Sequence, residues 1–124
     1  MFHMEQNLMD KYFETLDMAA FRMMHQMDSP KAMRLFRHVL DVEHEAGPEA
    51  DYIIRTWKKE RLRQMLLSHD WTYNYSDDHR AWTKGQEERD AIIKLSKELG
   101  LESKVVDCFN AFIEGNLSQV VETL

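Results

Sequence analysis

The stretch that decides the fold runs from residue 49 to residue 69 and reads EADYIIRTWKKERLRQMLLSH. Its large apolar side chains recur at intervals of three and four residues, and they are Ile53, Ile54, Trp57, Leu62, Met65 and Leu66. Residues at these intervals share one face of a helix, so the stretch predicts a helix with one buried stripe. Five basic residues between the apolar positions are expected on its outer face: Arg55, Lys58, Lys59, Arg61 and Arg63.

Two further helices are predicted upstream. Residues 4–27 place an apolar stripe on one face, at Met9, Phe13, Leu16, Ala20, Met23 and Met27, with Tyr12 and Met24 beside it. Leu8, Met18 and Phe21 fall outside the stripe, and a helix that is apolar on more than one side is buried twice or meets a partner. A second helix is expected over residues 30–46.

The second helix has recognisable ends and its own inward side chains. Ser29 suits a helix N-cap, and Pro30 suits the first helical position, where no N–H is needed. Gly47 and Pro48 are typical of a helix end. The side chains expected inside are Met33, Phe36, Val39 and Leu40.

Downstream, residues 70–77 predict a short extended connector, because Trp71, Tyr73 and Tyr75 alternate with polar residues. Ser76, Asp77 and Asp78 have N-cap chemistry for a helix over about residues 78–99. A fifth helix is expected over residues 102–114, followed by a short turn from Ser118. The first of these two helices has one line of residues, flanked by Ile93 and Leu95, and that line is Trp82, Gly85, Arg89, Ile92, Ser96 and Leu99. On the second helix the side chains expected inward are Val105, Phe109, Phe112 and Ile113.

Composition agrees with a helical domain. The chain has 124 residues, of which 44% are hydrophobic and 31% charged, with 4 Gly and 2 Pro. So few turn residues argue against a sandwich or barrel, and the length fits one domain. We therefore expect an all-α fold, a single compact domain over residues 1–124 with about five helices and the aromatic connector.

The location expected is the cytoplasm. The only cysteine, Cys108, lies in an apolar helical setting where it is expected to fill the core, which fits a reducing compartment. The N-terminus lacks the basic and apolar regions of a signal peptide, and no run approaches the ~20 apolar residues of a membrane span.

Two functional alternatives stay open beside protein binding. The net charge of −6 disfavours general nucleic-acid binding, but the basic residues Arg55, Lys58, Lys59, Arg61 and Arg63 form a local candidate surface. Ser76, Asp77, Asp78 and His79 suggest a small hydrolase or metal-dependent enzyme, although helix capping explains the same residues. His38, Asp41 and His44 form an incomplete metal pattern without a second copy on another helix. We expect no cofactor, no metal and no enzymatic activity.

Protein binding is the function expected from the remaining pattern. Methionine is over-used on surfaces that adapt to partners, and aromatic residues dominate binding hot spots. The partner-binding candidates are Met4, Met18, Phe21, Trp71, Tyr73, Tyr75 and Trp82. The two-sided first helix also raises the hypothesis of a homodimer.

Residues 70–86, DWTYNYSDDHRAWTKGQ, resemble a segment of small uncharacterised bacteriophage proteins. The shared pattern is W-x-Y-x-Y-S-D-D-x-R-x-W-x-x-G, which here runs from Trp71 to Gly85. The resemblance implies a small accessory protein that binds and modulates a host protein in the host cytoplasm. It carries no activity and no residue roles to this chain.

Overall fold

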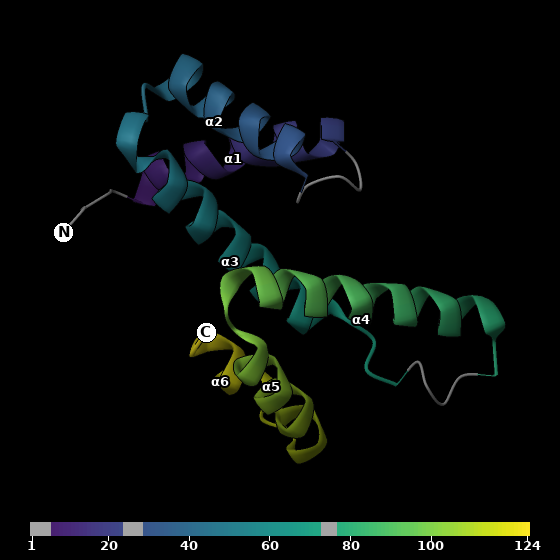
Figure 1. The fold of residues 1–124 in the computed structure, drawn as a ribbon. Helices are drawn as coiled ribbons and strands as arrows, with labels where there is room; N and C mark the ends of the chain where they lie inside the picture. The colour runs from purple at the N-terminus through teal and green to yellow at the C-terminus, as the bar shows by residue number, and fades with distance from the viewer. Residues whose placement is uncertain (1–5, 24–28, 73–76) are drawn as a thin grey trace. The chain divides into compact units, whose positions relative to one another are not determined.

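The computed structural model describes residues 6–23, 29–72 and 77–124, and no strand occurs among them. Its helices are α1 (Gln6–Met23), α2 (Pro30–His44), the short 3₁₀ helix η1 (Gly47–Glu49), α3 (Ala50–Ser68), α4 (His79–Leu99), α5 (Glu102–Glu114) and α6 (Leu117–Glu122) (Figure 1). The predicted all-α class is confirmed. None of the described helices is long and apolar enough to cross a membrane.

Two compact units divide the chain within α3, after Trp57. Each unit has its own cluster of buried apolar side chains, and α3 supplies residues to both clusters. The units are therefore described separately. The prediction of one domain over residues 1–124 stays a prediction, because contact density does not establish whether the units fold independently.

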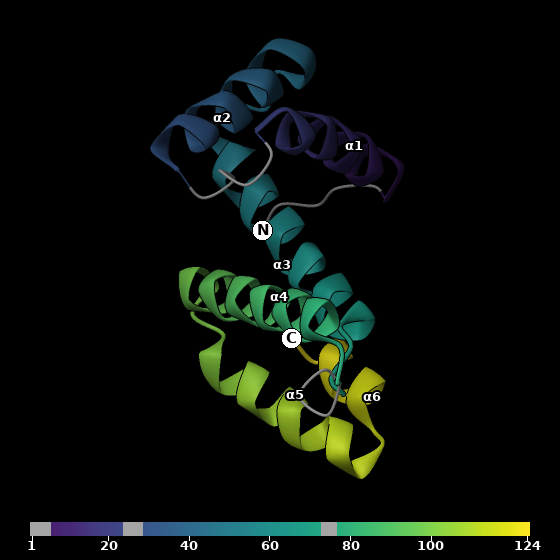
Figure 2. The same ribbon diagram turned by 90° about the vertical axis from the view of Figure 1, so that its right-hand side faces the viewer.

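In the unit Met1–Trp57, α1 and α2 run in opposite directions side by side (Figure 2). Their facing sides bury Leu16, Phe36 and Leu40 completely. Met9, Phe13, Met23, Met33 and Val39 pack around this core as partly buried side chains. The described members of the stripes predicted for the first two helices thus lie inside, as the helical spacing requires. Met24 and Met27 lie outside the described residues.

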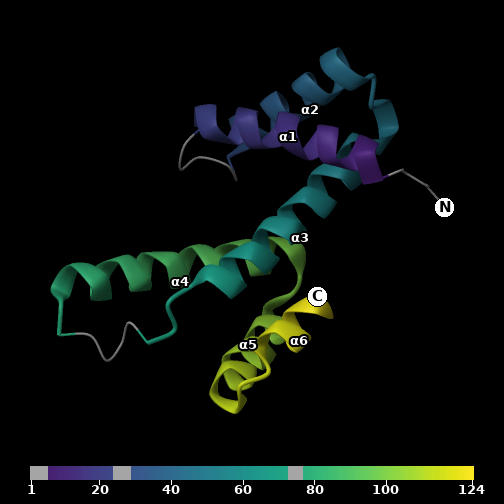
Figure 3. The same ribbon diagram turned by 180° about the vertical axis from the view of Figure 1, so that it is seen from behind.

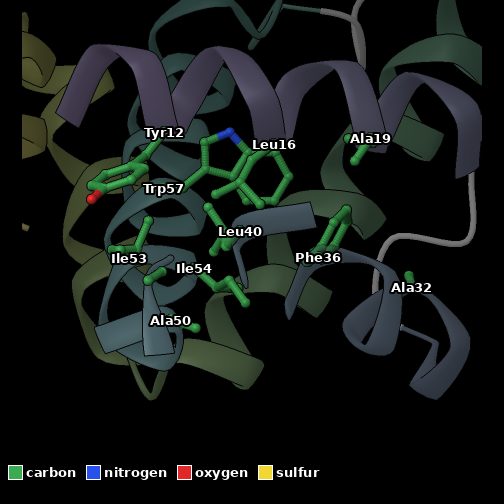
Figure 4. Close-up of a cluster of buried hydrophobic side chains, with 12 residues drawn as sticks. Tyr12, Leu16, Ala19, Ala32, Phe36, Leu40, Ala50, Ile53, Ile54 and Trp57 are labelled. Atoms are coloured by element: carbon green, nitrogen blue, oxygen red, sulfur yellow. The ribbon is translucent and has the colours of Figure 1, made fainter. Parts of the chain in front are cut away.

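Trp57 closes this core from α3 (Figure 4). Its side chain is buried, and its ring lies edge-on to Phe36 with the centroids 5.3 Å apart. Its indole Nε1 donates a hydrogen bond of 2.8 Å to the Oδ1 atom of Asp17 on α1. A buried indole needs such an acceptor, so Trp57 joins α1, α2 and α3 through both its apolar ring and its polar edge.

In the unit Lys58–Leu124, α5 packs against α4 and α6 (Figure 3). The buried side chains are Leu62, Leu66, Ile92, Leu99, Val105, Cys108, Val121 and Leu124. Burial, with Asp107 adding a smaller effect, raises the pKa of the Cys108 thiol, so this cysteine is core filler as expected. Arg63 donates to the carbonyl oxygen of Leu124 at 2.7 Å and ties the end of α6 to α3.

The predicted helix ends are partly confirmed. Ser29 caps α2 by accepting from the Ala32 N–H at 3.1 Å, and Asp78 caps α4 by accepting from the Arg80 N–H at 2.9 Å. The end of the second helix was placed too late, because α2 stops at His44 and Glu45 takes the left-handed cap with φ 52°. Asp41 explains the early stop, since its carboxylate accepts from the Gly47 N–H at 3.0 Å and turns the chain there.

Two inward assignments on the fifth helix were wrong, and one of them is Phe112, which is 38% exposed. Ile113 is 83% exposed, although it was expected inside with Val105. The buried face of α5 instead consists of Val105, Cys108 and Ala111, which follow one another at intervals of three. Ile113 comes five positions after Cys108 and two after Ala111, so it lies on another side of the helix.

The role of Trp57 can be tested by substitution. Trp57→Ala is expected to lower the free energy of unfolding by about 3–5 kcal/mol, because it removes a large buried ring and leaves a cavity. Urea denaturation followed by circular dichroism measures the change. Tyr52→Ala, at a half-exposed position on the same helix, is the control and should cost under about 1 kcal/mol. Equal effects of the two substitutions would show that Trp57 does not close the core.

Candidate interaction surfaces

The partner-binding candidates on α1 lie on its outer face. Phe21 is 85% exposed and Met18, one turn earlier, is 60% exposed. Because they are three residues apart, their side chains are neighbours on the helix surface. Met4 lies outside the described residues, so the α1 surface consists of Met18 and Phe21.

Charged side chains surround this pair of apolar residues. Glu14, four residues before Met18 and seven before Phe21, is exposed on the same face as the pair. Asp17 is exposed on one flank, and Lys11 and Arg22 on the other, by helical position. Asp17 is engaged by Trp57 of the same unit. An apolar patch with a charged border is the composition of a protein-binding surface rather than of a core.

The aromatic residues of the connector divide into two groups. Trp71 is held inside its unit, with its ring edge-on to Phe109 at 4.7 Å and stacked near Phe112 at 5.7 Å between centroids. Its Nε1 donates to the Leu66 carbonyl oxygen at 3.1 Å. Trp71 therefore clasps the connector onto α3 and α5. Tyr73 and Tyr75 lie outside the described residues.

The connector begins with a turn at Trp71 and Thr72. Asp70 accepts hydrogen bonds at its Oδ1 from the Thr72 N–H at 3.0 Å and from the Thr72 hydroxyl at 2.6 Å. Trp71 and Thr72 form a turn rather than the extended segment expected there. The alternation that predicted an extended segment continues into residues outside the described ranges.

Trp82, one of the partner-binding candidates, lies near the start of α4. It is 41% exposed, and its ring is parallel to that of the exposed His79 with the centroids 6.4 Å apart. Both residues lie in the first turns of α4, ahead of the buried positions Ile92 and Leu99. The helical line that runs through Trp82 is therefore buried only in its later part.

The residues proposed for acid–base chemistry have a structural explanation. Asp78 is the N-cap of α4, and Asp77, Asp78 and His79 are all exposed. Exposure leaves these groups in water, whereas catalytic carboxylates are commonly tuned by burial. Ser76 lies outside the described residues. Within the described ranges, no group of three or more His, Cys, Asp or Glu residues could hold a metal ion.

The basic residues of α3 do not form one outer face. Lys58 is 3% exposed and forms an ion pair with Glu98 of α4, which corrects its placement on the outer face. The reason is visible in the spacing, because Lys58 lies four residues before the buried Leu62. Arg63 donates a hydrogen bond to the Leu124 carbonyl oxygen. The other basic residues of α3 do not take part in these two contacts, and they are Arg55, Lys59 and Arg61.

Sequence reasoning missed a buried histidine beside the connector. The side chain of His69 is 1% exposed, and its ring meets Trp71 edge-on at 4.9 Å. Its Nδ1 lies 3.8 Å from the Glu88 carboxylate. Burial lowers the pKa of His69 below its ordinary 6.5; Glu88 and Asp70 oppose the shift and Arg89 adds to it. His69 is therefore neutral at physiological pH.

The exposed apolar residues of α5 were also missed. Val106 is 55% exposed, and Ile113 follows it after two helical turns.

No model of a protein family matches the chain, and comparison with curated proteins and with solved structures gave no match either. Function must therefore be inferred from these surfaces and their residues.

Acidification should weaken the packing around His69. The unfolded state binds a proton near pH 6.5 while the folded state resists it, so stability is lost as the pH falls below 6.5 toward the lower folded pKa. His69→Phe keeps an aromatic ring but cannot be charged. Urea denaturation at about pH 7 and about pH 5 should show a smaller loss for this variant than for the unchanged chain. A His69 pKa above 6.5 by NMR would contradict this.

The Lys58–Glu98 pair can be tested by removing either partner. Glu98→Ala is expected to destabilise the protein by roughly 1–3 kcal/mol, because it leaves the Lys58 ammonium buried without this carboxylate. Lys58→Met removes the buried charge as well and should cost less. Urea denaturation of the two variants decides between these outcomes. A larger loss for Lys58→Met would mean that the pair itself stabilises the fold.

Proposed function

We propose that the chain is a protein-interaction module that binds its partner through the α1 surface, Met18 and Phe21. The observation that carries the proposal is the 85% exposure of Phe21 on a helix whose opposite face is already buried. A fully buried phenylalanine contributes about 1.5–3 kcal/mol relative to an exposed one, so folding leaves this contribution unused. Binding a partner would recover it.

The packing of α1 supports this assignment. The helix buries Tyr12, Leu16, Ala19 and Ala20 in its own unit, and this face is sufficient to hold it against α2. Met18 and Phe21 add nothing to that core. Their exposure therefore needs a reason other than folding, and a binding surface supplies one.

The partner proposed is another protein, and the resemblance to phage proteins makes a host protein the candidate. Two apolar side chains cover only part of a specific interface, which buries about 800 Å² on each partner. Met18 and Phe21 would thus act as anchors inside a larger contact with a polar border. The consequence for the partner would be steric occlusion of its own surface.

Photo-crosslinking tests the proposal in the cell that produces the protein. Benzoylphenylalanine at position 21 or 18 is expected to give a discrete adduct with one protein. The same group at Arg34, an exposed position on α2, is the control and should give little of that adduct. Mass spectrometry then identifies the partner, and an adduct of two identical chains would identify a homodimer. Equal adducts at all three positions would reject the α1 surface.

Charge substitution gives the matching affinity measurement. Phe21→Asp should weaken binding of the identified partner by roughly tenfold or more, as expected for a hot-spot residue. The free energy of unfolding should change by no more than about 0.5 kcal/mol, because the side chain is at the surface. An unchanged affinity with an intact fold would place the binding surface elsewhere.

A further inference from the structure

A second apolar surface lies on α5, in the other unit. Val106 and Ile113 are exposed and seven residues apart, so they lie on one face of the helix two turns apart. Phe109, partly buried, lies between them at the third position after Val106. The i, i+3, i+7 order is the spacing with which one helix contacts another.

Aromatic side chains extend this stripe on its inner side. Phe112 is 38% exposed and stacks near Trp71, which also meets the Phe109 ring. The guanidinium of Arg89 lies 5.2 Å from the centroid of Phe109 and fixes that ring from the α4 side. The stripe is therefore continuous with a supported aromatic cluster, which keeps its apolar side chains in place before any partner arrives.

Phe109 packs against the core of its unit, but the core does not use Val106 and Ile113. α5 already buries Val105, Cys108 and Ala111 there, each to at least 98%. Val106 precedes Cys108 by two residues and Ile113 follows Ala111 by two, so both point away from that face. Folding of this unit consequently leaves their apolar area in water.

The charges that α5 itself places on the stripe and on its solvent side are negative, whereas Arg89 of α4 lies over Phe109 on the inner side. Glu102 precedes Val106 by four residues and occupies the same face, while Asp107 and Glu114 each follow a stripe residue by one and lie on its solvent side. The only cation of α5, Lys104, precedes Val106 by two residues and projects away from the stripe. A partner that complements this border carries positive charge on both sides of an apolar face.

We propose that the α5 stripe, defined as Val106, Phe109 and Ile113, binds an amphipathic helix with basic flanks from a partner protein. A second copy of the same face fits less well, because it would bring three more carboxylates and no α5 cation to the contact. The stripe does not depend on the α1 surface, so the two proposals can fail separately. Together they would give the chain two protein-binding faces.

Synthetic helices serve as probes for the stripe. The positive probe is a fluorescein-labelled peptide of about 18 residues made of Leu and Lys, with Leu at i, i+3, i+4 and i+7 positions. The matched probe replaces every Lys with Glu. Fluorescence anisotropy at low salt with the full chain is expected to show micromolar binding of the Leu/Lys peptide and at least roughly tenfold weaker binding of the Leu/Glu peptide.

Variants locate the binding on α5. Ile113→Asp and Val106→Asp should each weaken the Leu/Lys peptide roughly tenfold or more. Val42→Asp makes the same chemical change at an exposed apolar position of the other unit, and it should leave the affinity unchanged. Phe21→Asp should also have no effect, which separates this surface from the α1 surface.

Charge reversal tests the border without touching the stripe. Glu102→Lys with Glu114→Lys should weaken the Leu/Lys peptide and strengthen the Leu/Glu peptide, each by several-fold. Glu87→Lys, at an exposed position on α4, is the matched control. These surface changes keep the fold, so a loss of binding cannot be attributed to unfolding when the circular dichroism melting curves coincide.

Three results would overturn the proposal. The first is equal affinity for the two peptides, and the second is unchanged affinity in Ile113→Asp. The third is a light-scattering mass of two chains that returns to one chain in Ile113→Asp, because a second copy would then occupy the stripe. Selective binding of the Leu/Lys peptide that is lost in both stripe variants supports it.

Discussion

One helix has to supply the buried face of two cores, and this constraint organises the structure. The first part of α3 places Ile53, Ile54 and Trp57 in the core of the unit Met1–Trp57. Its second part places Leu62 and Leu66 in the core of the unit Lys58–Leu124. A single continuous apolar stripe along α3 therefore serves two sets of neighbours. Any residue on that stripe is buried whatever its chemistry.

Lys58 shows what this constraint does to a charge. It falls on the same line as Leu62, between the residues of the two cores, and its ammonium is removed from water. Glu98 of α4 supplies the opposite charge. Burial of the ammonium costs desolvation, whereas the Glu98 side chain stays 37% exposed, so the pair offsets the cost of the buried charge rather than adding a large gain in stability. Within the basic run of α3, Lys58 therefore has a structural role.

Periodicity predicted most of the fold because it reports burial directly. The stripes on α1, α2 and α3, the caps at Ser29 and Asp78, and the helix ends at Leu99 and Glu114 all follow from local spacing or local hydrogen bonding. The interval of four residues between Lys58 and Leu62 also indicates that Lys58 is buried, whereas its charge alone favours an outer position. Periodicity fails where a local side-chain hydrogen bond decides, as at the turn that Asp41 makes after α2 by accepting from the Gly47 N–H.

The candidate surfaces were harder to predict, because an apolar residue looks the same whether it faces a core or a partner. Met18 and Phe21 could be singled out, since they fall outside a stripe that was already complete. Ile113 could not, because α5 has apolar residues around more than half of its circumference and only tertiary packing decides which of them are buried. Trp71 is the opposite case, an aromatic candidate for a partner that the fold uses as a clasp.

The two proposed surfaces differ in their borders, and this difference bears on mechanism. The α1 surface carries Glu14 on its own face and has opposite charges on its two flanks, whereas the charges that α5 itself places around the α5 stripe are acidic. Electrostatic borders select partners more than they add affinity, so the two proposed surfaces would select different partners. A chain that only blocked one target would need a single such surface. The second proposed surface would therefore add the holding of another protein to the steric occlusion proposed for the α1 surface.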